Sequence, residues 1–174
     1  MKTRSKLATL ALSSGLAVAG FAGIAGPAHA VDTATTFTIS GGGLSLSVPA
    51  TANLGAVATG TLVASGQLGP VTVADTRGAL VNAWATTVTS SAFVTGAGTA
   101  PHMVVTEPSV AYVSGAFTAH SGLGVFVPGT KSPAPLYTGA AGNSSTTWDP
   151  TITMTLLSSQ VAGAYTGTVT HSVA

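Results

Sequence analysis

The chain of 174 residues contains 22 glycines, no cysteine and only nine charged side chains, five basic and four acidic. So few charges exclude the basic surface that binds nucleic-acid phosphates or an anionic membrane, and the lack of cysteine excludes a disulfide framework. Stability must therefore come from packing and backbone pairing.

The first 30 residues have the layout of a secretory signal peptide. Three cations within the first six residues precede an uncharged run from Leu7 to Gly26, and Ala28-His29-Ala30 places small residues where signal peptidase reads them. We therefore predict cleavage after Ala30, a secreted or cell-surface location and no lipid or covalent anchor. A retained membrane anchor is the alternative, since about 20 apolar residues can span a bilayer.

Residues 31–174 then form one mature domain that has two cations and four anions, which gives a net charge of 2 − 4 = −2. This part of the chain contains 26 threonines and 15 serines, so hydroxyl side chains must cover most of its solvated surface. Threonine suits an exposed β-sheet because it is β-branched with a polar end. Charged residues that block edge-to-edge pairing are scarce, and self-association is expected.

Apolar and hydroxyl residues alternate with a period of two along this domain, and no segment has a helical period. In chain order we expect strands at 35–39, 44–48, 61–64, 71–74, 83–89, 110–118, 151–156 and 165–173, eight in all, with a further short strand at 125–127. Short strands joined by Gly- and Pro-rich turns predict an all-β fold, specifically a single antiparallel β-sandwich of the Ig-like, Greek-key type. A barrel is the alternative. The side chains expected to face the core are Trp84, Ile152, Met154, Leu156, Tyr165 and Val169.

Four residues stand out because their types are rare in this chain. Asp75 and Arg77 lie between two expected strands, where an ion pair would clasp the turn and position the strand that bears Trp84. Trp84 and Trp148 are candidate ligand-binding residues, since an exposed indole can stack on a sugar ring. The alternative is that both tryptophans fill the core, where each indole N–H would need a partner.

Catalytic and metal sites lack support in the sequence, so neither an enzyme nor a cofactor is expected. Glycoside cleavage needs a carboxylate pair about 5 to 10 Å apart, and no two of the four carboxylates are paired in sequence. His102, His120 and His171 are too far apart in sequence for a metal-binding motif. Cleavage before His29 would instead create an N-terminal copper ligand, and His171 is expected to be a partly buried imidazole. Asn143-Ser144-Ser145 matches a glycosylation sequon but is interpreted as a polar turn.

Two segments resemble the WxL domain of Gram-positive cell-surface proteins. Val71 to Gly78 followed by Trp84-Ala85-Thr86, and Gly163 to Val173 at the end of the chain, are similar to the two motif regions of that family. The resemblance implies a β-rich secreted domain that binds peptidoglycan non-covalently. Trp84-Ala85-Thr86 lacks the family's leucine, and His171-Ser172-Val173 replaces the second Trp-x-Leu.

The sequence thus leaves two functions open. One is a non-catalytic module that binds cell-wall glycan, and the other is a structural surface protein that assembles with copies of itself through strand edges.

Overall fold

The computed structural model describes residues 33–174, so the predicted signal peptide, its cleavage site and the copper alternative at His29 lie outside the described part. The chain divides into two compact units, Met1–Phe37 and Thr38–Ala174, and the second contains every described strand. This second unit is all β apart from the short 3-10 helices η1 (Pro101–Met103) and η2 (Glu107–Ser109). The prediction of an all-β fold is confirmed.

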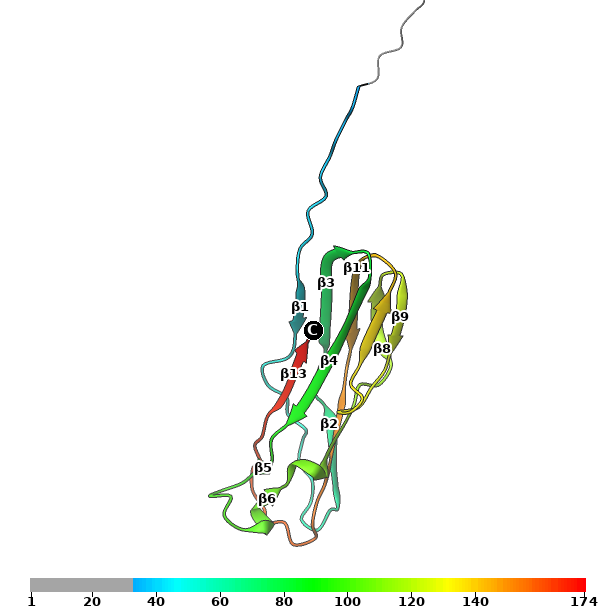
Figure 1. The fold of residues 1–174 in the computed structure, drawn as a ribbon. Helices are drawn as coiled ribbons and strands as arrows, with labels where there is room; N and C mark the ends of the chain where they lie inside the picture. Colours follow the sequence, from blue (N-terminus) through cyan, green and yellow to red (C-terminus); the bar gives the residue numbers. More distant parts are fainter. Residues whose placement is uncertain (1–32) are drawn as a thin grey trace, which may run out of the picture. The chain divides into compact units, whose positions relative to one another are not determined.

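The strands form several antiparallel sheets (Figure 1). The first has the order β1 (Leu44–Ser47), β3 (Val71–Ala79), β11 (Gly142–Trp148) and β8 (Phe117–Ser121). The second has the order β13 (Val169–Val173), β4 (Asn82–Ser90), β10 (Leu136–Gly139) and β9 (Gly124–Val127). The third joins β2 (Val63–Gln67), β12 (Thr151–Thr155) and β7 (Val110–Val113), and β5 (Phe93–Val94) pairs with β6 (Val104–Val105).

Alternation along β4 shows why this segment is a strand. Its even-numbered side chains Asn82, Trp84, Thr86 and Val88 are buried, whereas the intervening residues are exposed. This period of two gives one face to the core and the other to solvent. Position 78, just before the end of β3, has φ 64°, which favours the glycine found there.

Two groups of buried side chains make up the core of the second unit. The first cluster draws on β3 and β11 of the first sheet and β4 and β10 of the second, with the residues Val71, Val73, Trp84, Tyr137 and Trp148. The second cluster lies around β12 and contains Phe93, Val105, Val110, Ile152 and Met154. Leu156, Tyr165 and Val169 are partly buried against it, so all six side chains that the sequence directs inward do contribute to the core.

Most of the expected strands are present, with shifted ends, but three differences stand out. The segment 35–39 is not a strand, because no described strand supplies its backbone with a partner. The expected strand 110–118 is two strands, β7 and β8, since the chain breaks at Gly115 with φ 70°. β13 begins only at Val169, although the pattern predicts a strand from Tyr165.

β10 and β11 were not expected, and β11 proves to be a central strand. Its inward side chains are Ser144, Thr146 and Trp148, all of them buried, so its first two core positions are hydroxyls. The interpretation of Asn143-Ser144-Ser145 as a polar turn is wrong for this reason: the three residues lie inside β11.

Candidate functional site

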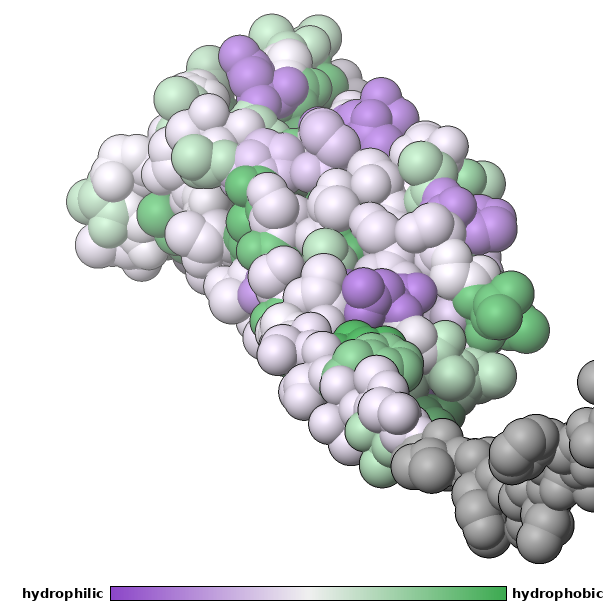
Figure 2. Space-filling view, turned by 90° about the horizontal axis from the view of Figure 1, so that it is seen from above, coloured by the Kyte–Doolittle hydropathy of each residue, from purple (hydrophilic) through white to green (hydrophobic). Residues whose placement is uncertain are grey.

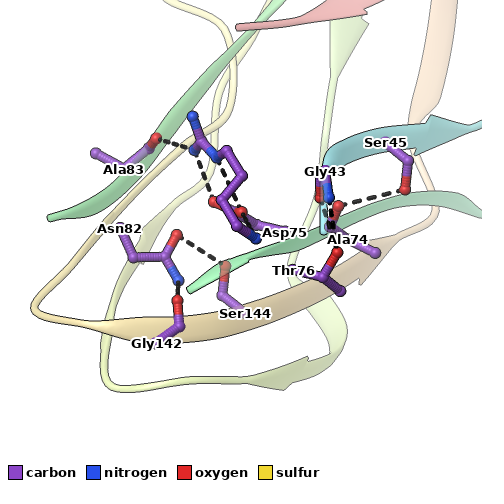
Figure 3. Close-up of polar contacts among 10 residues, drawn as sticks. Gly43, Ser45, Ala74, Asp75, Thr76, Asn82, Ala83, Gly142 and Ser144 are labelled. Carbon is purple, nitrogen blue, oxygen red and sulfur yellow. Dashed lines mark hydrogen bonds and ion pairs between the residues drawn. The ribbon is translucent and has the colours of Figure 1, made fainter. Parts of the chain in front are cut away.

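Asp75 and Arg77 both lie in β3, two residues apart, and form an ion pair, so the expectation that they belong to the turn after this strand is wrong (Figure 3). The Asp75 carboxylate is fully buried and accepts hydrogen bonds from the Arg77 backbone N–H at 3.0 Å, from Nε at 2.9 Å and from Nη2 at 2.6 Å. Nη2 also donates to the Ala83 carbonyl at 2.8 Å, next to Trp84. The side-chain bond to Arg77 lowers the pKa of Asp75 and raises that of Arg77. The pair therefore holds the start of β4 against β3, as a structural element.

A second polar contact joins the start of β4 to β11. Asn82 is fully buried, and its Nδ2 donates to the Gly142 carbonyl at 2.7 Å. Ser144 Oγ lies 3.5 Å from Asn82 Oδ1 (Figure 3). These contacts give partners to the buried Asn82 and Ser144, whereas the buried Thr146 Oγ1 of β11 has no hydrogen-bond partner among the described residues.

Trp84 and Trp148 are core residues, with exposed fractions of 3% and 0%. Their rings stack with centroids 6.3 Å apart at an interplanar angle of 15°. Tyr137 also stacks on Trp84, with ring centroids 5.9 Å apart. Neither indole presents a face to solvent, so the hypothesis that Trp84 or Trp148 stacks on a sugar does not fit this structure. The physical reason is that both large rings pack in one apolar core cluster with Val71, Val73 and Tyr137.

A chain of three aromatic side chains runs from the core toward β13. Trp148 Nε1 donates to Tyr112 Oη at 2.9 Å, and Tyr112 Oη lies 3.2 Å from His171 Nε2. Burial raises the pKa of Tyr112 to about 12 and lowers the pKa of His171. If Nε2 of a neutral His171 accepts a hydrogen bond from the Tyr112 hydroxyl, that hydroxyl can also accept the bond from Trp148, and all three polar groups have a partner. The partly buried imidazole expected from the sequence is thus present, but nothing in the sequence identified Tyr112 as its partner.

The remaining charged groups of residues 33–174 are dispersed. Lys131 pairs with Glu107, and Asp149 Oδ1 accepts a hydrogen bond from the Gly69 N–H at 3.1 Å. Within this part of the chain no three His, Asp or Glu side chains gather at a possible metal site.

An apolar cleft of about 780 Å³ lies at the end of the second unit that holds β5 and β6. It is bordered by the segments 52–61 and 160–167, with Met154 and Leu156 of the β12 region between them. Tyr165 fixes one wall, since its hydroxyl contacts the carbonyls of His102 and Val161 at 2.9 and 3.0 Å. The volume lies within the usual range of binding pockets, about 300–1,000 Å³. Sequence patterns did not reveal this cleft because its walls are irregular segments far apart in the chain.

A smaller groove of about 190 Å³ lies over β8 and β11. The hydroxyl side chains of Ser121, Ser145 and Thr147 line it, together with Ala119 and the chain at His120. The His120 imidazole lies on the other face of β8, since its cross-strand partner is the buried Thr146 and its ring centroid is 4.9 Å from that of Phe126. Such a surface can hydrogen-bond a polar ligand but offers little apolar area.

No helix in the described part of the chain has the length and apolar character needed to cross a membrane. No known family model matches the sequence, and neither the curated proteins nor the solved structures include a significant match to it.

Proposed function

We propose that this chain is a secreted, non-catalytic surface protein that associates with copies of itself through the edges of its β-sheets. The observation that carries the proposal is the composition of the outer strands. The two four-stranded sheets and the three-stranded sheet end in β1, β8, β13, β9, β2 and β7, and none of these six strands contains Asp, Glu, Lys or Arg. Natural sheets usually protect such edges with charges, especially lysine.

Exposed apolar side chains add to this argument. Val125 and Val127 on β9 are 63% and 43% exposed, and Val63 on β2 is 50% exposed. The surface seen in Figure 2 is mostly near neutral in hydropathy, with separate hydrophilic and apolar residues. A surface with so little charge has weak electrostatic repulsion between copies, which favours association.

The proposal includes the finer architecture expected from the sequence. In it, the two four-stranded sheets are the layers of one β-sandwich, and their outer strands form its open sides. The cluster formed by β3, β4, β10 and β11 supports this arrangement, since side chains of both sheets share one core.

Light scattering coupled to size-exclusion chromatography tests the proposal. We expect the average mass of the secreted protein to rise with protein concentration. Val125→Lys places a charge on edge strand β9 and should lower the association constant by about tenfold or more. Thr87→Lys adds the same charge to an exposed position of β4, which is an inner strand, and should leave association near the wild-type level. A mass equal to one chain at every concentration would contradict the proposal.

Peptidoglycan binding is the second candidate, because the groove over β8 and β11 supports it. Its three hydroxyl side chains can hydrogen-bond sugar hydroxyls, and the WxL resemblance implies the same ligand. The test is retention of the protein on purified peptidoglycan. Loss of retention in Ser121→Ala, with retention kept in the matched variant Ser172→Ala, an exposed strand serine outside the groove, would support this function. Equal retention of both variants and the wild type would place any wall binding elsewhere.

A further inference from the structure

The residues before β1 form an exposed segment with the sequence pattern of a strand. In residues 33–40, Phe37 and Ile39 alternate with threonines and are 85% and 84% exposed. No described strand pairs with this segment. Two large apolar side chains on one face of an extended, uncharged peptide are typical of a strand whose partner is missing.

The apolar cleft has backbone groups that could supply that partner. Residues 52–57 along its wall make no backbone–backbone hydrogen bond with any described residue, although Gly55 N–H bonds to Asn53 Oδ1 at 2.9 Å. Next to this wall, the cleft exposes carbon atoms of Leu54, Met154 and Leu156. A strand added here would gain backbone hydrogen bonds on one side and apolar contacts on the other.

The chain's own Ile39 cannot reach this cleft. Leu44 pairs with Asp75, which is linked through Arg77 to the start of β4, whereas the cleft contains Phe93, beyond the far end of β4. Figure 1 shows the β3–β4 turn and the β5–β6 pair at opposite ends of the second unit. Ten residues of strand span about 33 Å, but the five residues from Leu44 to Ile39 span at most about 18 Å.

We propose that residues 33–40 of one copy bind as an added β-strand along residues 52–57 of a second copy, with Phe37 and Ile39 in its apolar cleft. The inference rests on the proposed self-association and specifies the contact that drives it. Segment and cleft are different surfaces, so each copy can donate one strand and accept another. Such a head-to-tail contact forms a closed ring if the rotation between successive copies closes, and an open chain of increasing length if it does not.

The first test removes the apolar side chains of the segment. Phe37→Ser/Ile39→Ser alters two exposed residues and should leave the thermal unfolding midpoint unchanged, while association weakens by about tenfold or more. Thr36→Ser/Thr38→Ser is the matched control, since these positions lie on the opposite face of the segment. Association equal to wild type in both double variants would overturn the inference, and would leave the edge proposal standing if Val125→Lys still weakens association.

The second test measures the contact directly. A fluorescently labelled peptide of residues 33–40 should bind saturably to the Phe37→Ser/Ile39→Ser protein, whose cleft is free, and a peptide with serine at both apolar positions should bind about tenfold more weakly or less. Ala162→Trp fills the cleft from an exposed position on its rim and should reduce peptide binding to a similar extent.

Two results would refute the contact whatever the oligomeric state. One is equal binding of the two peptides, since it would show that Phe37 and Ile39 do not enter an apolar site. The other is a small apolar molecule, found in the cleft by native mass spectrometry, that excess peptide fails to displace. Peptide binding that is saturable, needs both apolar residues and is lost in Ala162→Trp would support it.

Discussion

Two buried tyrosines differ in their hydrogen bonding, and this difference predicts unequal effects of the same Tyr→Phe substitution on stability. Tyr112 and Tyr137 are 2% and 1% exposed. The Tyr112 hydroxyl bonds to Trp148 Nε1 and His171 Nε2, whereas the Tyr137 hydroxyl has no hydrogen-bond partner among the described residues. Tyr112→Phe should therefore destabilise the domain, and Tyr137→Phe should not.

The expected magnitude follows from which groups each change leaves unpaired. In Tyr112→Phe the indole N–H of Trp148, which is fully buried, loses its acceptor, and a buried unsatisfied donor costs about 1–3 kcal/mol. His171 is only partly buried, and its imidazole can bond to water instead, so the loss of its hydrogen bond to Tyr112 adds little to the destabilisation. We expect about 2 kcal/mol, or about 6–8 °C in the unfolding midpoint for a unit of this size. Tyr137→Phe removes a hydroxyl that leaves no partner behind, and its effect should stay within about 0.5 kcal/mol.

Urea unfolding followed by tryptophan fluorescence can measure both effects, because Trp84 and Trp148 lie in the core. A further check uses Trp148→Phe as the background, in which Tyr112→Phe should cost clearly less. If the two tyrosine variants lose equal stability, the reasoning from unpaired groups is wrong.

Three further predictions concern pH and exposure. Burial lowers the pKa of His171, so the unfolded state binds a proton at this residue more readily than the folded state does. Stability should therefore fall as the pH drops through the ordinary value of 6.5. In His171→Gln, the urea midpoint should depend less on pH across this range. Arg77 lowers the pKa of Asp75 below 3.8, so the ionised Asp75 stabilises the folded state above that value, and this stabilisation is lost as pH falls through the folded-state pKa. Arg77→Gln should therefore move the acid-unfolding midpoint to higher pH. An unchanged midpoint would refute the coupling between the two residues. Iodide should quench Trp84 and Trp148 only weakly in the folded protein, and muramyl or other sugar fragments should leave their emission unchanged, since both rings are buried.

Local pattern was enough to predict the strands whose inward residues are apolar. β12 was expected because Ile152 and Met154 stand two positions apart, and β4 because Trp84 lies in a similar alternating run. Successive side chains of a strand point to opposite faces, so these residues share the buried face. The Asp75–Arg77 ion pair lay within reach of sequence reasoning for a similar reason: two rare opposite charges two residues apart in one strand lie on the same face and can meet.

β11 could not be predicted in this way because its core positions are occupied by Ser144 and Thr146. These hydroxyls are buried, and Ser144 is placed beside Asn82, a residue 62 positions earlier in the chain. Whether a polar side chain is solvated or buried depends on such distant partners, and a single sequence does not show which residues become neighbours. The same holds for Tyr112 and for the apolar cleft, whose two irregular walls are about a hundred residues apart in the chain.

The exposed faces of the sheets are held by hydroxyl pairs, and this limits what can make association specific. Thr72 bonds to Thr147 across two strands at 2.9 Å, and Ser65 bonds to Thr153 at 3.0 Å. Hydroxyls bond equally well to water, to one another and to a neighbouring chain, so an edge built from them permits pairing without fixing its register. A defined contact needs features that occur once per chain. The large apolar side chains of residues 33–40 and the apolar cleft along residues 52–57 are each formed by one particular set of residues, and for this reason we place the specificity of assembly there rather than along the uncharged edges.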